Sequence, residues 1–301
     1  MKRRYVTTDV FTERMFGGNP LAVMLDAQGL STDDMQAIAL EFNYSETSFV
    51  FPPDDARHTA KVRIFTPRTE VPFAGHPNVG TAFVLAREER FASAASCGAF
   101  VFEEAAGLVP LTLLREHGAV IGAELKAPEA LSRHSVVSRE TAAACLSLDA
   151  TDVATTVHAP QIVSVGLPFL AVELASREAL RRSKPNIAAH ANLLPLDGAD
   201  AIFAYWREPA AASEMVLHAR TFSPLDGIVE DPATGSACAA TIALLATLMV
   251  RPRDQLAWRI HQGVDMGRPS LLLGRTLLRD GQLAAHIGGR CVAMLDGSLN
   301  L

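Results

Sequence analysis

Residues 230–240 read EDPATGSACAA and run directly into an uncharged, apolar segment that ends at Val250. Pro232 and Gly235 favour a tight turn, and the apolar residues that follow are typical of a buried helix. The first N–H groups of a helix have no partner within it and lie at the positive end of its dipole, so Gly235 and Ser236 would let an anion approach closely. The stretch therefore predicts an anion cradle, meaning a turn with the first residues of the helix after it.

The same pattern occurs earlier in the chain. HPNVGTA at residues 76–82 aligns without a gap with DPATGSA at residues 231–237, an offset of 155 residues (231 minus 76). Other matches keep the same order: GNPLAV at 18–23 with GLPFLAV at 166–172, SFVF at 48–51 with AIFA at 201–204, and RIFTP at 63–67 with RTFSP at 220–224. Ordered repetition predicts a duplicated chain, and such a pair of domains commonly places its site in the cleft between them.

Length and composition agree with this organisation. A chain of 301 residues exceeds the usual size of one core, and 49% hydrophobic with 20% charged residues is ordinary for a globular protein. The net charge of −6 and the lack of a basic stripe argue against nucleic acid as a partner. We expect a two-domain protein with no nucleic-acid partner.

Several features bear on compartment and metals. The basic start MKRRYVTTD meets Asp9 before any apolar core forms, so it does not predict a secretory signal. The longest uncharged run, residues 236–250, is shorter than the roughly 20 residues that a membrane span needs. The four Cys residues are far apart, and no His residues have metal-ligand spacing. We expect a cytoplasmic protein with no membrane partner and no metal.

Local patterns predict alternating strands and helices. Strands are expected at residues 5–11, 21–25, 47–51, 59–65, 99–102 and 108–114, and helices after Ser31 and near Val79. Ser31 and Asp34 form a capping pair for the first helix. Residues 116–160 show no clear pattern. Glu46 is expected at the mouth of a strand.

Seven motifs together resemble the PhzF-like phenazine-biosynthesis isomerase family. They are DVFT (9–12), GNP (18–20), NYSET (43–47), FTP (65–67), GHP (75–77), DPATGSA (231–237) and QGVDMGRPS (262–270). The resemblance implies an α+β, diaminopimelate-epimerase-like fold with two pseudo-symmetric domains, each a mixed β-sheet barrel around a central helix. We expect one domain at residues 1–118 with the C-terminal strand 286–301, and the other at residues 119–285.

The resemblance also implies the site. The family's acid–base residue falls on Glu46, and the substrate contacts fall on His76, Asp231 and Ser236. The substrate-binding residues are expected to include Gly75, Asn78 and Gly235 as well, and no cofactor is implied. Phenazine enzymes of the family often have small residues after the His, whereas Pro77-Asn78 stands here, so their substrate need not be the substrate of this chain.

Removing a proton from carbon needs a base beside a place that stabilises the resulting charge, and Glu46 with the two cradles would supply both. Apolar neighbours such as Phe49 and Phe73 would raise the pKa of Glu46 and let it act as acid and base. The alternatives are structural: Glu46 as a surface residue at a helix end, His76 bonded to backbone, Asp231 as a helix cap. Cys238 is expected to pack in the core.

Isomerisation of a small cyclic or unsaturated amino or hydroxy carboxylic acid is therefore the expected reaction. One alternative is an amino-acid racemase or epimerase of the same fold, whose two thiols would lie next to Gly80 and Gly235. His76-Pro77 and Asp231-Pro232 stand there instead. The other is a non-enzymatic binding protein, which the presence of Glu46 and its partners argues against. A homodimer is expected from the resemblance.

Overall fold

The computed structural model describes residues 2–209, 214–249 and 253–301, so Val250, the end of the predicted apolar run, lies outside the described residues. The chain forms two compact units, unit 1 with the residues up to Lys126 together with Gly288–Leu301, and unit 2 with Ala127–Ile287. The sequence placed these boundaries at residues 118 and 286. The N-terminal part of unit 1 extends to Lys126 because residues 119–126 form a strand that pairs within it.

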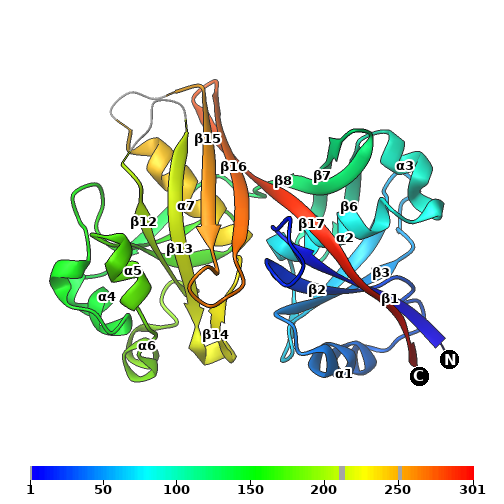
Figure 1. The fold of residues 1–301 in the computed structure, drawn as a ribbon, viewed down its shortest axis with the longest axis horizontal. Coiled ribbons are helices and arrows are strands. Elements are labelled where there is room, and N and C mark those ends of the chain that lie inside the picture. Colours follow the sequence, from blue (N-terminus) through cyan, green and yellow to red (C-terminus); the bar gives the residue numbers. More distant parts are fainter. Residues whose placement is uncertain (1, 210–213, 250–252) are drawn as a thin grey trace. The chain divides into compact units, whose positions relative to one another are not determined.

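Unit 1 is a closed ring of eight strands. Neighbours around the ring are β1 (Lys2–Val10), β2 (Asn19–Met24), β3 (Glu46–Phe51), β4 (Ala60–Phe65), β6 (Ala99–Glu104), β7 (Gly107–Glu116), β8 (Ala119–Lys126) and β17 (Gln282–Asn300). β17 closes the ring by pairing antiparallel with β1, and Figure 1 shows the two strands side by side at the chain ends. β2–β3 and β4–β6 are parallel, so the sheet is mixed. The short β5 (Glu70–Val71) pairs with β4.

The helix α2 (Gly75–Leu85) is the core of this barrel. Every one of its residues is buried, and it packs against β1, β2, β3, β7 and β8. A Cβ atom on Gly80 would press against the side chains of Leu21 and Val10, which shows how closely the barrel wall approaches the helix. An apolar helix without a polar face is stable only when it is enclosed in this way.

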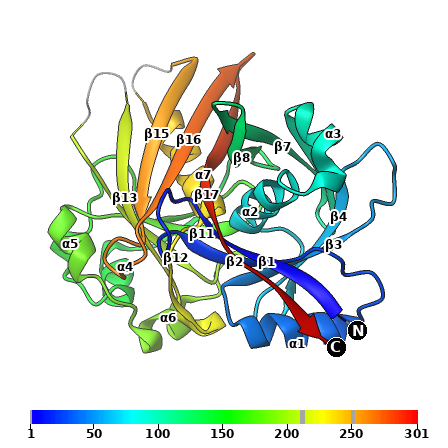
Figure 2. The same cartoon turned by 45° about the vertical axis from the view of Figure 1, so that its right-hand side comes forward.

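The helix α1 (Thr32–Phe42) covers the outer face of the barrel. Ser31 caps it, and Ser31 with Asp34 forms the predicted capping box. Its buried residues Met35, Ile38 and Ala39 pack in one cluster with Phe49 and Phe65. The short η1 (Glu89–Phe91) and α3 (Ala92–Ser96) follow α2. α1 packs against β3 and β4, and Figure 2 shows it near the two chain ends.

Unit 2 repeats this plan around α7 (Gly235–Thr247), which is buried apart from Ser236 and its last residue. Its strands pair in the order β9 (Ser132–Val136), β10 (Gln161–Ser164), β11 (Pro168–Glu173), β12 (Ile202–Arg207), β13 (Met215–Ser223), β15 (Gln255–Gln262) and β16 (Ser270–Arg279), with β14 (Ile228–Asp231) beside β13. Asp280 and Gly281, both with positive φ, form the tight turn from β16 into β17.

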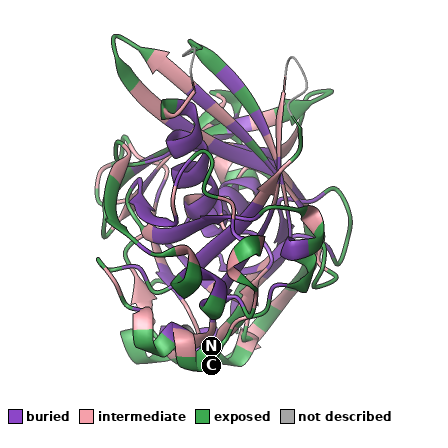
Figure 3. Ribbon diagram, turned by 90° about the vertical axis from the view of Figure 1, so that its left-hand side faces the viewer, coloured by how far each residue is buried: buried purple, intermediate pink, exposed green. Residues whose placement is uncertain are grey.

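Residues 116–160 do contain regular structure, which the sequence analysis missed. β8 and β9 lie there, together with α4 (Arg139–Cys145) and η2 (Ala150–Asp152). α4 packs with α5 (Arg177–Arg182) and α6 (Ile187–Leu193) over one core cluster, and η3 (Pro224–Asp226) precedes β14. Ala-rich segments carry a weak periodic signal because Ala buries little area. Figure 3 shows the buried residues gathered in the strands and central helices.

The structure also corrects the register of the repeat. α2 begins at Gly75 and α7 begins at Gly235, so the helices differ by 160 positions, not by 155. The gapless match aligned two prolines that have different places: Pro77 lies in the first turn of α2, where a missing N–H is tolerated, and Pro232 precedes α7. His76 therefore corresponds to Ser236, each being the second residue of its helix.

The second correction concerns Glu46. Thr47 pairs with Phe65 in unit 1, and Ile202 pairs with Phe222 in unit 2. Because Phe65 and Phe222 occupy the same place in the matched RIFTP and RTFSP motifs, Glu46 corresponds to Ala201, which is buried. Ala201 was matched to Ser48 from sequence alone. The α+β fold of two pseudo-symmetric barrels around central helices is confirmed, and one repeat carries a carboxylate where the other carries a methyl group.

Candidate functional site

The first cradle lies at the start of α2. Gly75 and His76 are its first two residues, and Asn78 donates the first backbone hydrogen bond within the helix, to the Ala74 carbonyl at 3.4 Å. The N–H groups of Gly75 and His76 have no acceptor inside the helix, and Pro77 has no N–H at all. An anion at this end would meet two backbone donors and the positive end of the helix dipole.

Glu46 and His76 are brought together beside this cradle. The Oε2 atom of Glu46, the first residue of β3, lies 3.5 Å from Nδ1 of His76, and both side chains are largely buried. Asn19, at the start of β2, places its side-chain amide 3.3 Å from the same ring nitrogen. The sequence analysis quoted the GNP motif of residues 18–20 but assigned no role to Asn19. Phe49, which was predicted to be an apolar neighbour of Glu46, packs in the cluster beneath α1.

His76 is a neutral imidazole at neutral pH. Burial lowers its pKa to about 3, and the backbone carbonyl of Pro20 offsets only part of this effect. Its Nε2 atom is buried and has no hydrogen-bond partner in the described part of the chain. A neutral ring with one uncommitted nitrogen can exchange hydrogen bonds with a bound molecule without adding a charge.

Asn78 is the fourth residue of α2. It is fully buried, and its side-chain amide donates to the Ala74 carbonyl at 3.0 Å. Its Oδ1 atom has no hydrogen-bond partner among the described residues. Asn78 is thus tied to the residue before the helix, and its contact with a substrate stays a prediction.

The second cradle is organised by Asp231, at the end of β14. The Thr234 hydroxyl donates to the Asp231 carboxylate at 2.5 Å, and Thr234 is the residue that precedes α7. Asp231 is thus four residues before the helix and fixes the turn, while Gly235 and Ser236 open the helix itself. Gly235 is buried and Ser236 is half-exposed, so the serine side chain is the accessible one.

Gln262 holds this turn from behind, a role the sequence analysis did not assign. Its carbonyl oxygen accepts from the Thr234 N–H at 3.1 Å, and its amide nitrogen donates to the Asp231 carbonyl at 2.9 Å and to the Thr221 hydroxyl at 3.1 Å. Gln262 is fully buried at the end of β15. Gln262 is the first residue of the QGVDMGRPS motif, and this motif was the feature of the sequence that could have pointed to it.

The buried thiols Cys238 and Cys291 are not arranged as catalytic bases. Cys238 is fully buried in α7, and burial raises its pKa well above the usual range. Cys291, in β17, is also buried, and its pKa is raised for the same reason. Neither thiol is set up to form the thiolate that proton abstraction through sulfur needs. In residues 2–209, 214–249 and 253–301, no three His, Cys, Asp or Glu side chains group together as metal ligands would.

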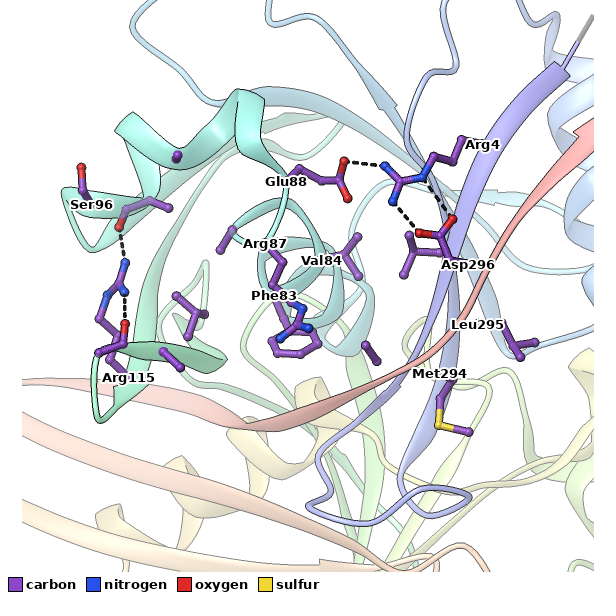
Figure 4. Close-up of a pocket in the computed structure, with 18 residues that line it drawn as sticks. Arg4, Phe83, Val84, Arg87, Glu88, Ser96, Arg115, Met294, Leu295 and Asp296 are labelled. Carbon is purple, nitrogen blue, oxygen red and sulfur yellow. Dashed lines mark hydrogen bonds and ion pairs between the residues drawn. The ribbon is translucent and has the colours of Figure 1, made fainter.

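A pocket of about 770 Å³ opens at the other end of α2, in unit 1 (Figure 4). Its arginines are engaged in structural contacts: Arg4 is held between Glu88 at 2.6 Å and Asp296 at 2.5 Å, and Arg115 donates to backbone carbonyls. Arg87 lies over the ring of Phe83. Cations stabilise the negative end of a helix dipole. We therefore assign this pocket no part in the chemistry.

No helix in the described ranges is long and apolar enough to cross a membrane. The model of a family described as phenazine biosynthesis-like protein matches residues 8–297. An uncharacterised isomerase of Mesorhizobium japonicum is 40% identical, covering 99% of this chain and 98% of the relative.

The trans-2,3-dihydro-3-hydroxyanthranilate isomerase of Pseudomonas aeruginosa is 34% identical, with 98% of each chain covered. Among solved structures, a PhzF-family phenazine biosynthesis protein of Bacillus anthracis matches with a TM-score of 0.86 at 23% identity over the whole of both chains. The matches extend over both units rather than over one cradle. This chain belongs to the phenazine biosynthesis-like protein family.

Proposed function

We propose that this protein is a cofactor-independent isomerase that moves a proton between two carbons of a small unsaturated or cyclic amino or hydroxy carboxylic acid. The observation that carries the proposal is the pairing of Glu46 with neutral His76 beside the first turn of α2. The carboxylate supplies a base, and the cradle supplies fixed positive dipoles for the charge that develops.

The reaction needs no second reactant. Glu46 takes a proton from a C–H bond, the electron pair of that bond delocalises into the unsaturated system, and the protonated Glu46 returns the proton to a different carbon. Atoms and oxidation state are unchanged. His76 donates or accepts a hydrogen bond through Nε2 at the amino or hydroxyl group, and backbone N–H groups at the cradles hold the carboxylate. Asp231 and Ser236 would contact the polar groups of the substrate.

The single base is supported by the repeat. Ala201 stands in unit 2 where Glu46 stands in unit 1, and the buried thiols Cys238 and Cys291 offer no alternative base. Two buried, protonated thiols would not supply the pair of bases that inversion through cysteine uses. The relatives named isomerases support an isomerisation, and the single base is our proposal.

The first compound to assay is trans-2,3-dihydro-3-hydroxyanthranilate, the substrate in the name of the Pseudomonas aeruginosa relative. The reaction is run in heavy water and the product is examined by mass spectrometry and proton NMR. Return by a base shielded from solvent leaves part of the original hydrogen on the new carbon. Complete deuterium incorporation would contradict a single shielded base.

A thermal-shift screen of small cyclic amino and hydroxy carboxylates tests the substrate class without assuming this compound. A ligand at a hundred times its Kd stabilises the folded state by about 2.7 kcal/mol, which gives a measurable shift. If no compound of the class stabilises the protein and none is turned over, the proposed function is wrong.

A further inference from the structure

Glu104, the last residue of β6, is a buried carboxyl outside the proposed chemistry. Both of its carboxyl oxygens are buried, and neither makes a hydrogen bond of good geometry in the described part of the chain, although the Asn78 amide of α2 is near enough to act on the carboxyl group. A carboxylate in such a place loses its hydration and gains little in return. A buried polar group without a partner calls for an explanation.

The repeat shows what this position does in unit 2. Lys61 pairs with Glu103 in unit 1, and His218 pairs with His261 in unit 2. Lys61 and His218 are equivalent through the matched β4 and β13 motifs, so the next residues, Glu104 and Gln262, occupy the same place at the end of β6 and β15. Gln262 is the fully buried residue that holds the turn before α7.

An amide performs that task because it is neutral and has both a donor and an acceptor. Gln262 accepts from the Thr234 N–H, and its amide nitrogen, with two N–H donors, lies within hydrogen-bond distance of the Asp231 carbonyl and two hydroxyls. A protonated carboxyl is the nearest equivalent among acids, since it has one O–H donor and one carbonyl acceptor. An ionised carboxylate has no donor.

The surroundings of Glu104 favour the protonated form. Burial raises the pKa of Glu104 to about 8, and the Asn78 amide of α2 acts in the opposite direction without cancelling that rise. Charged side chains on neighbouring strands are engaged elsewhere: Lys61 with Asp54, Arg63 with Glu70, and Glu103 with His58. In α2, the imidazole of His76 is neutral and faces Glu46 through Nδ1.

We propose that Glu104 works as a neutral carboxylic acid, the counterpart of the Gln262 amide, and that it positions Asn78 and the first turn of α2. Its O–H is the donor for the buried Oδ1 of Asn78, which has no partner among the described residues. Loss of that proton removes the donor and adds a buried negative charge close to the first cradle. Anions at α2 are then repelled, so Glu104 sets an upper pH limit for ligand binding there.

The first test needs no ligand and is independent of the proposed function. Between its ordinary pKa of 4.5 and about 8, Glu104 holds a proton in the folded state and not in the unfolded state. The stabilisation from this proton is present at pH 4.5 and is lost as the pH rises toward 8. Relative to Glu104→Gln, the wild-type unfolding equilibrium should therefore shift toward the unfolded state roughly tenfold per pH unit between pH 5 and 7.5.

Glu116→Gln is the matched control for this urea-unfolding series. Arg290 lowers the pKa of Glu116, an exposed residue of β7, so the difference between wild type and this variant should not change between pH 5 and 8. A parallel pH dependence for wild type and Glu104→Gln would overturn the neutral acid. Glu104→Ala should be less stable than Glu104→Gln at pH 7.5, because only glutamine restores the donor and acceptor.

The second test rests on the proposed function and uses 3-hydroxyanthranilate, a stable aromatic carboxylate, in calorimetric titrations at pH 6.5 and 9. The Kd should rise at least tenfold more for wild type than for Glu104→Gln, and comparison of the two removes the titration of the probe itself. Equal changes in Kd would overturn the link to the cradle. If the probe binds neither protein, the proposed ligand class fails, while the unfolding series still decides the state of Glu104.

Discussion

The Oε2 atom of Glu46 lies 3.5 Å from Nδ1 of His76, so the candidate base and the second residue of the barrel's central helix share one buried corner of unit 1. β3 and α2 bring them together although they are 30 positions apart in the chain (76 minus 46). A neutral imidazole beside a carboxylate orients that group without neutralising it. The first two predictions follow from this pair.

Glu46→Gln keeps the shape of the side chain and removes the base. The usual contribution of a positioned general base is roughly a hundredfold to ten-thousandfold in rate, so kcat should fall by that factor while ligand binding is largely retained. Steady-state kinetics and calorimetric titration measure the two quantities. Glu41→Gln, at an exposed position of α1, is the control and should be active. Activity of Glu46→Gln within tenfold of wild type would show that Glu46 is not the base.

The buried state of His76 predicts acid sensitivity. Its pKa is lowered from 6.5 to about 3, so the unfolded chain binds a proton here between these values and the folded chain does not. The associated stability is fully present above pH 6.5 and is lost as the pH falls toward 3. Relative to the His76→Gln variant, the protein with His76 should lose about 2 kcal/mol of its free energy of unfolding between pH 6.5 and 4.5.

Urea unfolding checks this, with both proteins carrying Glu46→Gln so that titration of Glu46 does not contribute. If the two unfolding curves shift equally with pH, the imidazole is not held neutral by burial.

Gly235→Val tests the second cradle. A branched side chain at the first residue of α7 would block close approach of an anion to the backbone N–H groups there. We expect the Kd for a carboxylate ligand to rise by at least about tenfold, which corresponds to about 1.4 kcal/mol, with a smaller loss in the free energy of unfolding. Gly235→Ala is the graded control and should have a weaker effect on binding. Comparable losses in binding and folding would count against the cradle.

We also predict a homodimer, on the basis of the family. Sedimentation velocity at micromolar concentration should give a species of twice the 32.2 kDa chain mass. If the only species detected has a mass near 32 kDa, the predicted dimer is wrong.

The sequence determined much of the local structure, because local signals depend on neighbouring residues. Ser31 and Asp34 specified the start of α1, the apolar run after Gly235 specified a buried helix, and the repeated motifs specified two similar domains. The family motifs selected Glu46 and His76, which the structure places together. The weak patterns of residues 116–160 did not reveal β8, β9 or α4.

Only the tertiary structure decided which positions of the two repeats are equivalent. A gapless alignment maximises letter matches, whereas equivalence in space depends on strand pairing and on where each helix begins. These features make three pairs of positions equivalent in the two repeats: His76 and Ser236, Glu46 and Ala201, and Glu104 and Gln262. The burial of Glu104 and of the His76 ring is also a tertiary property, because distant segments of the chain remove the water that would otherwise keep their pKa values ordinary.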